Sequence, residues 1–234
     1  MDSLSFIIGG VLPYVVVPVF LAGMVYRFRS WLKAPQPGKM TLFPAGGSPF
    51  KEVLAETLFF PSLFKGDRVL WFFAWFFHVT LALVFLGHVR VFSGVIDAML
   101  LKLGMTREGI LSMSAISGGA AGILLCATGI LLFFRRIVIP RVREITGIPD
   151  FLAPLLIVTI ILTGDWMRFT GHFELEQTRV WAVSLLTFSP TGIPADGMFL
   201  IHLFLAQVLI VFIPFSKILH FGGIFFTQAL IKRS

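Results

Sequence analysis

Four of the five histidines lie inside long apolar runs, where an ionisable side chain is costly and usually serves a function. His78 and His88 share one run, ten residues apart, and His202 and His220 share another, eighteen residues apart. If the two runs cross a membrane in opposite directions, His78 meets His220 and His88 meets His202. The spacing therefore predicts two histidine pairs, one towards each membrane face.

Helix geometry places these two pairs at different depths. Ten helical residues rise about 15 Å and eighteen rise about 27 Å. The pairs should therefore lie roughly 20 Å apart along the membrane normal, inside an apolar core about 30 Å thick. Eighteen residues also make five full turns, so His202 and His220 are expected on one helix face, apart from any twist at Pro214.

Taken singly, each histidine has simpler explanations, namely a proton relay, an interhelical hydrogen bond or an interfacial position. As pairs they indicate a metal centre. Zinc usually takes four ligands and copper prefers a cysteine or a third histidine, whereas haem iron supplies four nitrogens itself and needs only two axial ligands. The chain has one cysteine, Cys126, and no C-x-x-C-H motif, which excludes covalent haem attachment. The pattern predicts two b-type haems, with an inner one held by His78 and His220 and an outer one by His88 and His202.

The elements that must position these residues are membrane helices. The chain of 234 residues is 57% hydrophobic and 13% charged, with a mean hydropathy of +0.93, and a soluble domain carries about twice that charge. We predict a single-domain, all-α integral membrane protein over residues 1–234, a bundle of five transmembrane helices whose first apolar run is retained. The expected spans are 6–26, 69–89, 112–134, 151–167 and 197–221.

Basic residues predict the orientation of this bundle. Fourteen of the nineteen lie on the side of the loop at 27–68, the loop after the third span and the C-terminal end. The positive-inside rule puts that side in the cytoplasm, so the N-terminus is expected outside and the C-terminus cytoplasmic. The net charge of +7 thus reflects topology and makes no case for nucleic acid. The loop at 27–68 is either solvated or carries a short amphipathic helix at 49–60, on the membrane surface or as a docking platform.

Several residues near the histidines are candidate haem contacts. Arg135 and Arg136 are expected near the propionates of the inner haem, and Arg90 near those of the outer one. Gly87 precedes His88, and the small residues of "SGGAAG" at 117–122 would allow close approach of a helix or of a flat macrocycle.

These features together resemble the nitrate reductase gamma-subunit family of five-helix dihaem b-type cytochromes. The resemblance is carried by the histidine spacings, by "SGGAAGILLCATGILLFFRRIVIPRVR" and by "HLFLAQVLIVFIPFSKILH". Within the family, "GHVRVF", "GDWMRF" and "PFSKILHFGGIFF" look more like the cytochrome subunits of sulfite-reduction-associated and heterodisulfide-reductase-like complexes. The resemblance implies an electron-transport subunit of anaerobic respiration in the inner membrane, with a menaquinone or similar quinone reacting near the outer haem. It implies as partners a cytoplasmic iron–sulfur subunit, similar to that of heterodisulfide-reductase-like complexes or to the nitrate reductase beta subunit, and further membrane and periplasmic cytochrome subunits.

We expect the quinone near His88, Arg90 and the outer end of the fourth span, where Asp165 is a candidate proton acceptor beside Arg168. The alternative is an interfacial carboxylate that pairs with Arg168. Nitrate reductase members of the family carry a lysine near the quinone in the loop after the second span, and in this chain Lys102 and Arg107 are the candidates for that position. The competing functions are a proton-coupled transporter that uses the histidines as relays and a haem-free membrane anchor.

Overall fold

The computed structural model describes residues 3–33, 49–171, 173–220 and 222–223, and every regular element in them is a helix. Five stretches are long and apolar enough to cross a membrane, namely Ser3–Lys33, Arg68–Phe92, Arg107–Val138, Ile148–Thr170 and Gly197–Phe215. The all-helical architecture and the five expected spans are therefore confirmed within the described residues. His172 and the end of the chain from 224 lie outside them.

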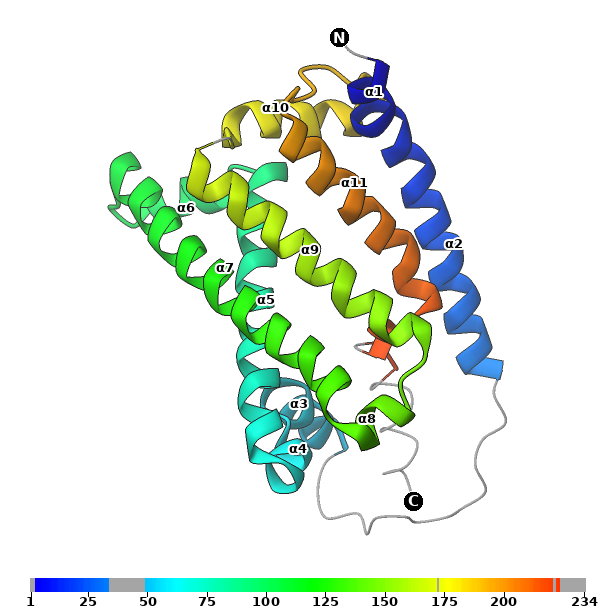
Figure 1. Cartoon of the computed structure of the whole chain (residues 1–234). Coiled ribbons are helices and arrows are strands. Elements are labelled where there is room, and N and C mark those ends of the chain that lie inside the picture. The colour runs from blue at the N-terminus through cyan, green and yellow to red at the C-terminus, as the bar shows by residue number, and fades with distance from the viewer. Residues whose placement is uncertain (1–2, 34–48, 172, 221, 224–234) are drawn as a thin grey trace.

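The spanning helices are α2 (Leu12–Lys33), α5 (Arg68–Phe92), α7 (Arg107–Val138), α9 (Ile148–Thr170) and α11 (Gly197–Phe212). They pack as a row in the order α5, α7, α9, α11 and α2. Helices α5 and α11 run in opposite directions, and among the described helices they are not a closely packed pair (Figure 1).

Short helices gather at the two ends of this row. At one end lie α1 (Ser3–Phe6), α6 (Val95–Lys102) and α10 (Leu175–Leu186); at the other lie α3 (Pro49–Phe59), α4 (Pro61–Gly66) and α8 (Pro140–Glu144) (Figure 1). The helix expected at 49–60 is therefore confirmed as α3, whose last two carbonyls accept hydrogen bonds from the indoles of Trp71 and Trp75. Helices α6 and α10 were not expected.

The first span contains a π-helical segment, η1 (Ile7–Val11), that follows from a proline. Pro13 has no N–H, so the carbonyl of Gly9 one turn earlier lacks its helical donor. The N–H of Leu12 bonds back to Ile7, so the carbonyl of Ile8 also lacks one. The indole of Trp181 donates to Gly9 at 2.8 Å and the amide of Gln207 donates to Ile8 at 2.9 Å, so both carbonyls are satisfied without water.

The fifth span, expected over 197–221 with an interruption at Pro214, is broken more completely than a bend at the proline would require. Helix α11 ends at Phe212 and is followed by two 3-10 turns, η2 (Ile213–Phe215) and η3 (Lys217–Leu219), with an extended Ser216 between them. Pro214 removes a helical donor, and the Ser216 hydroxyl accepts from the N–H of Ile218 to start the second turn. Because the helix stops, the expectation that His202 and His220 share one helix face is wrong.

Candidate functional site

The structure brings the four membrane histidines together as two pairs. The ring centroids of His78 and His220 lie 6.0 Å apart with the planes at 87°, and those of His88 and His202 lie 6.4 Å apart with the planes at 14°. One pair joins α5 to the turn after η3, and the other joins the far end of α5 to the start of α11. Each pair thus bridges two helices that do not pack closely.

All four rings hold their Nδ1 atom on a protein group. His78 and His88 contact the carbonyls of Ala74 and Val84 at 2.7 Å, His220 contacts that of Lys217 at 2.9 Å, and His202 contacts the Thr163 hydroxyl at 2.9 Å. A carbonyl oxygen only accepts, so Nδ1 donates in the first three rings. In a neutral ring Nε2 then keeps its lone pair, which is the form that binds a metal.

The separation within each pair suits a shared metal. A metal–imidazole bond is about 2 Å long and the nitrogen lies about 1 Å from the ring centre, so two axial rings on one iron have centres about 6 Å apart. The two pairs, at 6.0 and 6.4 Å, fall at this spacing. The donor set, two imidazoles in each place, is that of bis-histidine haem ligation. The residues present therefore fit a b-type haem at each pair.

His220 lies beyond the break in the fifth span, directly after η3, where the described backbone is helical again. Lys217 in η3 forms an ion pair with Asp150 at 2.7 Å, which ties the turn to the start of α9, and Leu219 is almost fully buried. Across the pair, the ring of Phe60 packs edge-on against His78 at 5.1 Å. Phe60 joins α3 to α4 with a left-handed backbone (φ 50°), so the α3–α4 corner reaches His78 directly.

His202 is held by two consecutive residues of α9 that the sequence did not single out. Thr163 contacts Nδ1, and a Cβ on Gly164 would lie 3.1 Å from the ring, so the glycine lets the imidazole lie close to the helix. The sequence offered one signal for them, because Thr163 and Gly164 directly precede Asp165, which is the candidate proton acceptor.

Asp165 and Arg168 point from α9 onto the glycine face of α7. A Cβ on Gly122 would collide with the Asp165 carboxylate, and one on Gly118 would lie 2.7 Å from the guanidinium carbon of Arg168. This face therefore packs against a helix in the described structure. Arg168 donates to the carbonyl of Ser114 at 3.2 Å, and among the described residues Asp165 makes no ion pair with Arg168. The charges of the two side chains still interact, so the alternative of an interfacial carboxylate paired with Arg168 stays a prediction.

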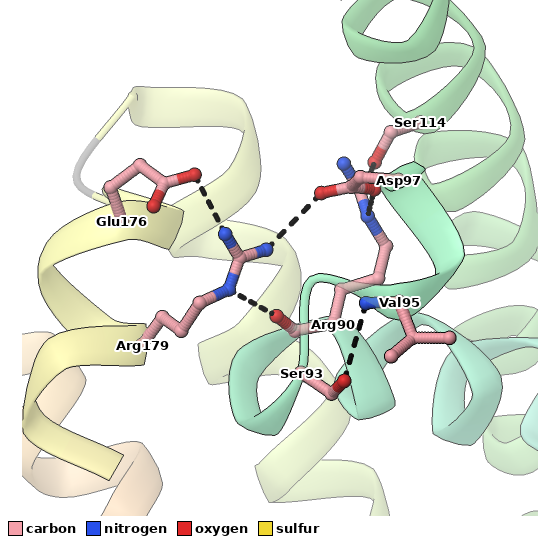
Figure 2. Close-up of polar contacts among 7 residues, drawn as sticks. All are labelled: Arg90, Ser93, Val95, Asp97, Ser114, Glu176 and Arg179. Atoms are coloured by element: carbon pink, nitrogen blue, oxygen red, sulfur yellow. Dashed lines mark hydrogen bonds and ion pairs between the residues drawn. The ribbon is translucent and has the colours of Figure 1, made fainter. Parts of the chain in front are cut away.

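Arg90 lies at the centre of a polar network beside the outer histidine pair (Figure 2). Its Nε donates to Asp97 at 2.7 Å and its Nη1 to the Ser114 hydroxyl at 2.6 Å. Arg179 from α10 binds the other Asp97 oxygen at 3.1 Å and the Arg90 carbonyl at 2.9 Å, while Glu176 contacts Arg179 at 2.8 Å. One carboxylate thus joins two largely buried arginines, and the network fixes the end of α5 two residues beyond His88.

The two arginines expected near the inner pair lie at the end of α7. Arg135 is 3.6 Å from Asp67, the residue that caps the start of α5. Arg136 is half-buried on the same turn. Lys102 ends α6 and Arg107 begins α7, so both lie at the opposite end, with Arg90.

Together, the spans define a multi-pass membrane protein, and its histidines form two pairs; the cytoplasmic membrane is the usual place for such a chain. The model of the nitrate reductase gamma subunit family matches residues 61–231, and the chain belongs to that family. The resemblance seen in the sequence is therefore confirmed.

The relatives include subunits of two kinds of complex. The Hdr-like menaquinol oxidoreductase cytochrome b-like subunit of Archaeoglobus fulgidus is 30% identical over 94% of this chain and 78% of its own length. The same subunit of Archaeoglobus profundus is 26% identical over 92% and 76%. The respiratory nitrate reductase 1 gamma chain of Escherichia coli is 25% identical over 88% and 87%.

Proposed function

We propose that this chain is the dihaem cytochrome b membrane subunit of a quinone-linked oxidoreductase. It exchanges electrons between the membrane quinone pool and a cytoplasmic iron–sulfur subunit. His78 and His220 would hold the inner haem b, and His88 and His202 the outer one. One observation carries the proposal. Within each pair the two ring centroids lie about 6 Å apart, and the Nδ1 atom of each of the four rings contacts a protein group. A haem held by two histidines would supply one-electron transfer at each pair.

The relatives support this proposal by name, as cytochrome b-like subunits of menaquinol oxidoreductases and as nitrate reductase gamma chains. We assign the chemistry of the terminal substrate to another chain of the complex. The positive-inside rule puts α3, α4 and α8 on the cytoplasmic side and α6 and α10 outside. His78 and His220 then lie nearest the partner, and Arg135 and Arg136 are the candidate propionate contacts there.

We place the quinone, of menaquinone type, beside the outer pair. Arg90 and Arg168 both donate to Ser114 on α7, and Asp165 lies one turn before Arg168 on α9. These groups and His88 would orient a quinol, and the Asp165 carboxylate would receive its proton. Arg90 would also be the candidate propionate contact, although its Nε and Nη1 are already bound to Asp97 and Ser114.

Haem quantitation on the purified chain tests the proposal most directly. Expression with adequate haem supply should give two b-type haems per chain, with a reduced-minus-oxidised spectrum to match. A colourless preparation would refute it and would leave a proton-coupled transporter or a haem-free anchor. Those two alternatives are then separated by histidine-dependent proton uptake in vesicles, which only the transporter shows.

A further inference from the structure

The four histidines differ in what holds their Nδ1 atoms. His78 and His88 bond to the carbonyl four residues earlier on their own helix, and His220 to the carbonyl three residues earlier. Such a partner comes with the helical turn itself. His202 is held instead by a side chain from another helix, Thr163 of α9. The backbone carbonyl of Ile160 on α9 also interacts with His202, so Thr163 is the partner of this ring that a single substitution can remove.

The contacts of Thr163 fix the direction of its bond to His202. Its Oγ1 lies 2.9 Å from the carbonyl of Ile160 and 2.9 Å from Nδ1 of His202. The hydroxyl has one proton, and the Ile160 carbonyl only accepts. Both contacts are satisfied together only when Oγ1 donates to Ile160 and accepts from Nδ1–H. The lone pair of His202 is then on Nε2, as in the other three rings.

Helix α9 also sets where the ring lies. Gly164 brings the helix backbone close enough that a Cβ there would come within 3.1 Å of the His202 ring. The imidazole therefore lies directly beside the α9 backbone at Gly164, and its Nδ1 atom has a hydrogen-bond acceptor. Together these contacts define both the tautomer and the orientation of the ring.

We propose that Thr163 is a positioning residue that selects the metal-binding tautomer of His202 and tunes the electron-donating strength of its imidazole. The inference rests on the proposed function for its redox consequence, whereas the tautomer belongs to the protein alone. A hydrogen bond from Nδ1–H raises the basicity of a ligating imidazole, which stabilises the oxidised metal. Removing the acceptor should raise the midpoint potential of the outer haem and weaken its retention by about 10- to 100-fold.

The experiment compares three variants in the full chain. Thr163→Val keeps the shape and loses the hydroxyl, and Thr163→Ser keeps the hydroxyl. Thr159→Val is the matched control, because Thr159 lies one turn earlier on α9 and, within the described part of the chain, its hydroxyl bonds to Leu155 of its own helix. Haem content and both midpoint potentials are measured by optical redox titration, and the outer haem is assigned by repeating the titration with His78→Ala.

We expect Thr163→Val to raise the potential of the outer haem, or to lose that haem alone, while Thr163→Ser and Thr159→Val match the wild type. Two haems at wild-type potentials in Thr163→Val would overturn the inference and leave the proposed function intact. A wild-type chain without haem would overturn the proposed function.

A readout that needs no haem covers that last case. Nitrogen-15 NMR of the haem-free chain with labelled histidine reports the tautomer, and comparison with His202→Ala assigns the signal. His202 should carry its proton on Nδ1 in the wild type and in Thr163→Ser. In Thr163→Val it should become a mixture of tautomers. A wild-type His202 protonated on Nε2 would overturn the inference.

Discussion

The imidazoles of His88 and His202 lie 6.4 Å apart and within 14° of parallel, although α5 and α11 are not closely packed in the described structure. At that distance the rings are not in direct contact. Each ring is held by a contact at its Nδ1 atom, which is made by the Val84 carbonyl for His88 and by the Thr163 hydroxyl for His202. The protein alone therefore orders the two rings at the spacing that a shared ligand would need. A site whose side chains are ordered before the ligand binds is preorganised.

Single histidine substitutions should remove one haem each. His88→Ala and His202→Ala should both give the same single-haem spectrum, and His78→Ala and His220→Ala should give the other. The two spectra should differ, because the planes of one pair are near parallel and those of the other near perpendicular. Haem content per chain falls from two to one in each case, and His172→Ala serves as the control. Loss of both haems or of neither in every variant would contradict the pairing.

Gly87 tests whether a macrocycle lies beside the outer pair. A Cβ at Gly87 would meet nothing within 4 Å, so the folded chain itself has room for a larger side chain there. Gly87→Leu should therefore leave the thermal stability of the haem-free chain within about 1 kcal/mol of the wild type, allowing for helix propensity. Haem content should nevertheless drop from two to one, with the outer haem lost. Full retention of both haems would show that the open space at Gly87 is not haem-facing.

The sequence predicted the spans and the histidine pairs through different signals. Hydropathy located all five spans. The first four extend beyond the expected ends, and side-chain caps such as Asp67 and Thr106 start two of the helices earlier, whereas the fifth begins at the expected Gly197 and ends early. The break after Phe212 was underestimated because a proline alone bends many membrane helices without ending them. Ser216, extended and capping the next turn, completed the break.

Other parts of the site could not be seen in the sequence because they depend on tertiary contacts. Thr163 looks like an ordinary membrane-helix threonine until α11 brings His202 beside it. Asp97 and Arg179 lie 82 residues apart in the chain and meet only because α10 crosses the end of α5. Helix α10 did leave a signal, since its buried Thr178, Trp181 and Ala182 follow helical spacing.

Asp165 should affect the reaction with quinol and not the haems themselves. Its carboxylate lies against Gly122, and no described residue hydrogen-bonds it. In Asp165→Asn, haem reduction by a menaquinol analogue should slow by about 100-fold, within the range for removing a proton acceptor. Reduction by dithionite and the content of two haems should be unchanged. Equal quinol rates in the variant and the wild type would assign Asp165 to packing alone.

Asp97 should matter for stability because it is shared by two arginines. The Arg90 and Arg179 side chains are 11% and 18% exposed, and Asp97→Asn would leave their charges without the shared carboxylate. The cost should be about 2–4 kcal/mol, somewhat below that of breaking a fully buried pair. Glu176→Gln is the matched control, because Glu176 is 81% exposed and its ion pair contributes about 0–1 kcal/mol. Thermal unfolding in detergent should show the variant melting well below the control, and equal melting temperatures would contradict the shared-carboxylate argument.

The π-helical segment of the first span gives a test of how α2 is fastened to α10 and α11. Trp181→Phe leaves the Gly9 carbonyl without a donor in an apolar surrounding, at a cost of about 1–3 kcal/mol. Gln207→Met should cost less, because Gln207 Oε1 is itself buried without a hydrogen-bond partner among the described residues and is removed with the amide. Trp166→Phe, at a position that is 57% exposed, is the control for losing an indole.

Combining Trp181→Phe with Pro13→Ala tests whether the effect of the tryptophan substitution depends on the proline. Pro13→Ala restores a backbone N–H one turn after Gly9, so the helix can supply the donor that Trp181 provides in the wild type. The destabilisation caused by Trp181→Phe should therefore shrink in the Pro13→Ala background, by about the 1 kcal/mol that one hydrogen bond contributes. Thermal melts of the four proteins in this double-mutant cycle measure the coupling. If Trp181→Phe costs the same with and without Pro13, the indole stabilises the span through packing rather than through the orphaned carbonyl.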